Sequence, residues 1–101
     1  MVGKYLFFSH NYIFERNLFF MNEVFLIGKV ISNINFYFMI NSKNFSIACF
    51  KIKTLDGQVV DIKLYDSLAD FVYSKIKLRD LVFVYGCLNT EFVIGKECNK
   101  L

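Results

Sequence analysis

Residues 63–90 read KLYDSLADFVYSKIKLRDLVFVYGCLNT and contain the end of one strand, a short helix and a further strand. The apolar residues of the middle part recur at helical spacing, which predicts a helix of about three turns. They are Leu68, Phe71, Val72 and Ile76. Ser67 followed by Asp70 resembles a capping box at the start of this helix. Residues 80–88 then alternate between two faces, as a half-buried strand does.

Three more strands are predicted before the helix, because inward and outward residues alternate there at period two. They cover residues 22–31, 45–54 and 59–65. Asp56 and Gly57 separate the last two strands, and a glycine accepts the positive φ that a tight hairpin turn needs. Gly28 lies within the first strand and predicts a bend or bulge, as small barrels require at their corners.

A short last strand is expected at residues 91–96, so the predicted order is β-β-β-α-β-β. This is the order of the OB fold, a partly open five-stranded barrel, and makes the chain all-β with one short helix. The 101 residues suit one domain. We assign the barrel to residues 21–101, because residues 1–20 show no clean period. Those twenty residues are either an extension upstream of a natural start at Met21, or a leader whose aromatic residues dock on the barrel.

The composition leaves apolar surface for a partner, since 55% of the residues are hydrophobic and 19% are aromatic. Phe25, Ile27, Phe83 and Tyr85 point away from the predicted core on two strands. They predict an oligomer interface in a dimer or tetramer. The alternative is that residues 1–20 cover them. The net charge of +3 is a mild bias towards anions, because the basic residues are scattered along the chain.

The cysteines are predicted to be free thiols. Cys49, Cys87 and Cys98 are odd in number and lack the C-x-x-C spacing of metal knuckles and redox dithiols. Reduced thiols are typical of the cytoplasm. No run approaches the roughly 20 apolar residues of a membrane helix. We therefore expect a cytoplasmic protein without metal, cofactor or membrane partner.

An enzyme is not indicated. His10 is the only histidine and lies in the first twenty residues, so no histidine-based acid–base pair or metal cluster can be assembled. Asp56 and Asp61 are explained by a turn and a strand rim. No glycine-rich phosphate loop is present, and no small-molecule substrate is expected.

Two blocks of sequence resemble the bacterial single-stranded DNA-binding protein family. Residues 21–30, MNEVFLIGKV, are similar to the strand that opens these proteins. Residues 63–90 are similar to the family stretch from the third strand through the helix, with its Leu-Ala pair, its basic turn and a strand ending in glycine. The two blocks cover a little under half of residues 21–101.

The resemblance implies a homo-oligomer that holds single-stranded DNA across the barrel face, in replication, recombination or repair. Aromatic rings stack on bases, so that binding is nearly independent of sequence. Tyr65 and Phe92 match the stacking positions, and Lys51, Lys53 and Lys63 supply the phosphate contacts.

The chain also departs from the family. The long hairpin that usually joins the second and third strands is cut to residues 54–58, there is no tryptophan, and the last strand is short. Tyr37, Phe38 and Met39 occupy the expected loop after the first strand. These departures keep a second interpretation open: an OB-fold module for protein interaction or oligomerisation that has lost its affinity for nucleic acid.

Overall fold

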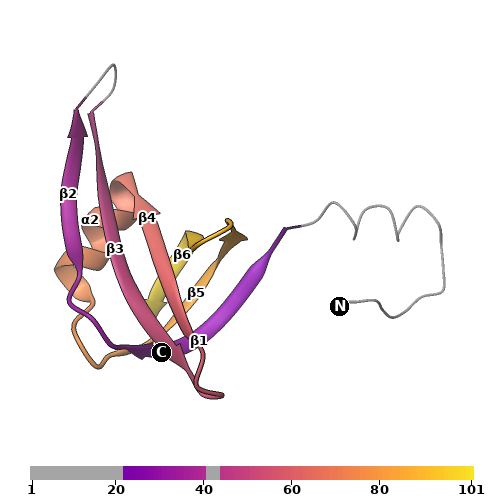
Figure 1. The fold of residues 1–101 in the computed structure, drawn as a ribbon. Helices are drawn as coiled ribbons and strands as arrows, with labels where there is room; N and C mark the ends of the chain where they lie inside the picture. The colour runs from indigo at the N-terminus through magenta and orange to yellow at the C-terminus, as the bar shows by residue number, and fades with distance from the viewer. Residues whose placement is uncertain (1–21, 41–43) are drawn as a thin grey trace, which may run out of the picture.

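The computed structural model describes residues 22–40 and 44–101 of the chain (Figure 1). This part contains six strands and one helix. They are β1 (Val24–Val30), β2 (Asn35–Ile40), β3 (Asn44–Thr54), β4 (Val59–Tyr65), α2 (Asp66–Lys75), β5 (Leu81–Leu88) and β6 (Val93–Lys100). The predicted extension at residues 1–20 lies outside the described residues. Among residues 22–40 and 44–101, no helix has the length and hydrophobicity of a membrane span.

Five of the strands close into a barrel. The sheet order is β1-β5-β6-β4-β3-β2, and β1 closes the ring by pairing with β3 as well as β5. All neighbours are antiparallel except β4 and β6, which run parallel. The helix α2 lies between β4 and β5 in the chain and packs against β3, β4 and β6. This confirms the predicted OB-type barrel with the order β-β-β-α-β-β.

The expected loop at Tyr37, Phe38 and Met39 is wrong, because these residues form the extra strand β2. It pairs with β3 from Asn35 opposite Cys49 to Ile40 opposite Asn44, and the two strands extend together from the barrel (Figure 1). Both faces of β2 are apolar, so the sequence shows a continuous run in place of alternation. The extra strand therefore lengthens the sheet on which β3 and β4 lie.

The barrel core follows the predicted alternation. The inward residues of β3, β4 and β5 are buried or nearly so, and α2 adds Ala69 and Val72 to the same core. The inward strand residues are Ala48, Phe50, Ile52, Val60, Ile62, Leu64, Val82, Val84 and Gly86. Because neighbouring residues of a strand point to opposite faces, the residues between them must point outward.

The predicted capping box is absent, because the helix follows β4 without a connecting loop. Tyr65 is the N-cap residue and makes no side-chain cap hydrogen bond. Asp66 has a φ of 57° and turns the chain directly into the first helical turn. The carboxylate of Asp70 instead accepts a hydrogen bond of 2.8 Å from the Ser46 hydroxyl of β3. Asp70 therefore ties the helix to the sheet.

The glycines act at close approaches and turns. Gly57 has a φ of 89°, which confirms the predicted hairpin turn. Gly28 lies where β1 begins to pair with β3, and a Cβ there would lie 2.7 Å from the carbonyl oxygen of Lys53. The register irregularity lies elsewhere, between Tyr85 and Gly86 in the pairing of β5 with β6.

The last strand is longer than the sequence predicted. β6 runs over Val93–Lys100, whereas residues 91–96 were expected. Its inward residue near the end is Cys98, which is buried in the core. The polar residues around Cys98 hid the strand pattern, because a single cysteine gives a weak apolar signal.

Candidate nucleic-acid interface

The side chains of β3 and β4 that point away from the core form one continuous surface, here called the outer face. The strand register places Cys49 opposite Lys63, Lys51 opposite Asp61, Lys53 opposite Val59 and Ile47 opposite Tyr65. The structure therefore brings four of the five predicted binding residues, Lys51, Lys53, Lys63 and Tyr65, onto two adjacent strands. Lys51 and Lys53 are exposed, and Lys63 and Tyr65 are half-buried.

An aromatic cluster occupies one end of the outer face. Ile47 of β3 is buried and has a tyrosine opposite it on each neighbouring strand. These are Tyr65 on β4 and Tyr37 on β2. The ring of Phe45 lies 6.1 Å from that of Tyr65. Tyr37 and Phe45 were missed as site residues, although Phe45 sits at an outward position of a predicted strand.

The Tyr37 hydroxyl contacts the outer face directly. It lies 3.9 Å from the Sγ of Cys49. This hydrogen bond, with partial burial as the second cause, raises the pKa of Tyr37 above its usual value. The Tyr37 hydroxyl therefore keeps its proton to a higher pH than an ordinary tyrosine does.

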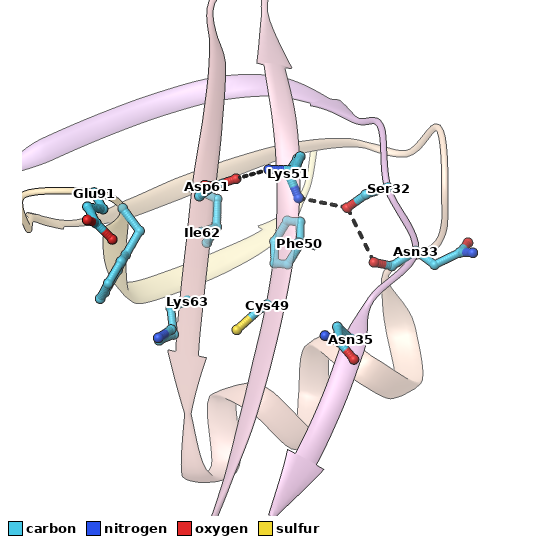
Figure 2. Close-up of a pocket in the computed structure, with 11 residues that line it drawn as sticks. Ser32, Asn33, Asn35, Cys49, Phe50, Lys51, Asp61, Ile62, Lys63 and Glu91 are labelled. Carbon is cyan, nitrogen blue, oxygen red and sulfur yellow. Dashed lines mark hydrogen bonds and ion pairs between the residues drawn. The ribbon is translucent and has the colours of Figure 1, made fainter.

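An ion pair lies among the lysines. The Lys51 Nζ is 2.5 Å from the Oδ1 of Asp61, and each side chain is about half exposed, at 52% and 50%. The Lys51 backbone N–H donates to the Ser32 hydroxyl at 2.8 Å (Figure 2). Exposed ion pairs contribute only about 0–1 kcal/mol to stability. Asp61 was predicted as a strand-rim residue, and the structure shows that it neutralises one of the three lysines.

Phe92, the fifth predicted residue, joins the outer face from the turn before β6. The Lys63 Nζ lies 4.3 Å from the centroid of its ring. Such a cation–π contact contributes about 0.5–1 kcal/mol at an exposed site. Phe92 was expected at the start of the last strand, but β6 begins one residue later, at Val93.

An open hollow of about 440 Å³ lies between these groups (Figure 2). Ser32 and Asn33 of the segment after β1 and Asn35 of β2 form one wall, and Glu91 and Phe92 form the opposite wall. Its floor is made by β3 and β4. The volume is in the range of small-ligand sites. The hollow is lined by the ammonium groups of Lys51 and Lys63, the carboxylates of Asp61 and Glu91, two amides and the Phe92 ring. No group of three or more potential metal ligands occurs in the described part of the chain.

The four residues of the predicted oligomer interface lie side by side on β1 and β5. Phe25 is opposite Tyr85 and Ile27 is opposite Phe83. The rings of Phe25 and Phe83 stack with centroids 5.9 Å apart, and Phe25 is 60% exposed. Partial burial and then a hydrogen bond with Glu23 raise the pKa of Tyr85. These residues form the apolar surface named here the β1–β5 patch.

The cysteines occupy three different environments. All are free; Cys49 and Cys87 are half-buried, and Cys98 is buried. Burial raises the pKa of the Cys98 thiol to about 11.

This difference predicts unequal thiol reactivity. At pH 8 we expect Cys49 and Cys87 to react with a disulfide reagent, and Cys98 to react only after unfolding, since the thiolate is the nucleophile. Counting thiols released before and after adding denaturant tests this. Three rapidly reacting thiols in the folded protein would contradict it.

The predicted absence of metal is tested separately by elemental analysis. One zinc per chain would contradict that prediction.

Comparison with known proteins gives structural neighbours alone. No family model matches the sequence, and no curated protein matches it. The wild-type single-stranded DNA-binding protein of Thermus aquaticus matches with a TM-score of 0.69 and 13% identity over 80% of this chain. This chain spans 40% of the length of that protein.

Two single domains match over nearly their whole length. The SSB domain of a Synechococcus sp. protein has a TM-score of 0.64 and 14% identity, covering 78% of this chain and 94% of that one. The N-terminal domain of PriB from Thermoanaerobacter tencongensis, solved as a dimer, has a TM-score of 0.59 and 17% identity, covering 79% and 96%. The chain therefore has the OB-type fold of single-stranded DNA-binding proteins, as its sequence resemblance predicted.

Proposed function

We propose that this chain binds single-stranded DNA without sequence preference through its outer face. The observation that carries the proposal is the meeting of three lysines with Tyr65 on two adjacent strands. Lysines attract phosphates, and an aromatic ring stacks on any base because every base has a π-face. The same combination of stacking platform and basic groove is the usual basis of non-specific single-strand binding.

The geometry suits an extended strand of nucleic acid. Residues two apart on one strand lie about 6.8 Å apart on the same face, and adjacent strands lie about 4.8 Å apart. Lys51 and Lys53 therefore form a short basic row along β3, with Lys63 beside it on β4. The aromatic cluster lies at the end of β4, so a bound strand would meet phosphate contacts and stacking contacts in turn.

The structural neighbours support this proposal, since one is a single-stranded DNA-binding protein and another is an SSB domain. The proposed setting is DNA replication, recombination or repair in the cytoplasm, where free thiols are usual. The proposed role is binding and not catalysis, because the outer face combines basic groups that can contact phosphates with rings on which bases can stack.

Titration of a fluorescent oligo-dT at low and high salt tests the proposal. Binding should be clear at low salt and weaken as salt rises, because phosphate contacts release counterions. Undetectable binding at low salt would refute the proposal. The short β3–β4 turn around Gly57 would then favour the second function, a protein-interaction module without nucleic-acid affinity.

We further propose that the β1–β5 patch joins copies of the chain into a dimer or tetramer. The description of the PriB domain as dimeric supports this. Ile27→Lys should shift the protein towards the monomer in sedimentation, because it places a charge beside the stacked rings of Phe25 and Phe83 in a contact that excludes water.

Leu78→Lys is a matched control, since Leu78 is an exposed leucine on the segment after α2. It should leave the assembly unchanged. A wild-type protein that sediments as a monomer at high concentration would contradict the proposed assembly.

A further inference from the structure

We propose that Asp61 acts as an internal competitor for phosphate, which holds Lys51 in the free protein and limits the affinity of the outer face for nucleic acid. This inference rests on the proposed function and assigns Asp61 as a residue that sets its affinity. It follows from the position of one carboxylate within the row of lysines.

The strand register places Asp61 directly opposite Lys51. Its Oδ1 lies 2.5 Å from the Lys51 Nζ, a close charge-assisted contact. A carboxylate and a phosphate both offer negatively charged oxygens to an ammonium group. The Asp61 carboxylate therefore occupies the place on Lys51 that a phosphate oxygen would take.

The ion pair has little to contribute to folding. Both partners are about half exposed, and exposed pairs stabilise proteins only slightly. Its effect on binding is larger, because the pair lies between Lys53 and Lys63 on the surface that a polyanion would approach. Asp61 also lines the hollow of Figure 2 together with Glu91. A negative charge at this place repels phosphate and lowers the effective charge of the lysine row.

The Phe92 ring is also occupied by an intramolecular contact. The ammonium group of Lys63 covers the Phe92 ring at 4.3 Å from its centroid. A base that stacks on this ring must displace Lys63, just as a phosphate that binds Lys51 must displace Asp61. In the free outer face, intramolecular contacts thus occupy both a phosphate-binding group, Lys51, and a stacking surface, the Phe92 ring.

Asp61→Asn tests the inference with the full chain and oligo-dT. Asparagine keeps the shape and removes the charge, so the magnitude of the log-log salt slope should rise by about 0.7. If wild type and variant bind alike at 1 M salt, a slope larger by this amount makes the variant bind about fivefold more tightly at 0.1 M salt. Glu97→Gln is the matched control, since Glu97 is an exposed carboxylate on β6 opposite Tyr85. It should change the affinity much less.

The same substitution in a Lys51→Ala background separates competition from plain repulsion. If Asp61 competes for Lys51, Asp61→Asn should raise the affinity more when Lys51 is present than in the Lys51→Ala background. With Lys51 present, the substitution removes the Lys51–Asp61 ion pair that DNA would otherwise have to break. Equal gains in both backgrounds would overturn competition. If the wild type binds and Asp61→Asn leaves its affinity unchanged, the inference fails while the proposed function stands. A wild type that does not bind overturns both, and unchanged melting temperatures verify that the variants are folded.

Discussion

Replacing Lys51, Lys53 and Lys63 together by alanine is expected to weaken oligo-dT binding about a hundredfold at 0.1 M salt, if wild type and variant bind alike at 1 M salt. Each phosphate contact on a single strand adds about 0.7 to the magnitude of the log-log salt slope, so losing three contacts flattens the slope by roughly two units. The loss should be alike for every base sequence, because phosphates carry no sequence information. Fluorescence titrations across a salt series measure both quantities.

The control removes the same charge elsewhere. Lys75, Lys77 and Lys96 are exposed lysines on α2, on the segment after it and on β6, outside the outer face. Their replacement by alanine also takes the net charge from +3 to zero. It should change the slope much less than the outer-face variant does. If the outer-face variant keeps the wild-type slope, the nucleic acid binds elsewhere on the barrel.

Tyr65→Ala is expected to cost about tenfold or more in affinity and to leave the salt slope nearly unchanged. Stacking of one base on an aromatic ring contributes about 1–3 kcal/mol and involves no charge. Tyr65→Phe should bind almost as the wild type does, because stacking uses the ring and not the hydroxyl. Titrations of the three proteins under the same conditions test this.

Tyr73→Ala is the matched control for the loss of a tyrosine ring. Tyr73 is 53% exposed on α2 and stacks on Phe36, which lies on the face of β2 opposite to Tyr37. We expect no comparable loss of affinity from this change. A Tyr65→Ala variant that is folded and binds with wild-type affinity would remove Tyr65 from the site.

The sequence predicted the barrel and the lysines of the outer face for the same physical reason. In a strand, burial of Ala48, Phe50 and Ile52 obliges Lys51 and Lys53 to point outward. Local alternation thus determines which face a residue occupies. It could not reveal β2, because Phe36 stacks on Tyr73 of α2 while Tyr37 lies opposite Ile47 on the other face, and an element apolar on both faces has no period.

Partners within the site were harder to predict, since they depend on how distant segments pair. The contact of Lys51 with Asp61 depends on the register across the turn at Gly57, and one residue more in that turn would have separated them. The contact of Lys63 with Phe92 depends on the parallel pairing of β4 with β6, which no local pattern indicates. The sequence therefore showed the candidate binding groups and not what holds them in the free protein.

Closure of the barrel also determines how the chain folds. Ile27 of β1 pairs with Phe83 of β5, far along the sequence, and the ring is complete only when β1 meets β3 as well. Folds dominated by such distant contacts form in milliseconds to seconds, since loop entropy is lost before the contacts are gained. The chain has no proline, so no slow prolyl isomerisation delays this step. We therefore expect the pairing of distant strands to limit its refolding rate.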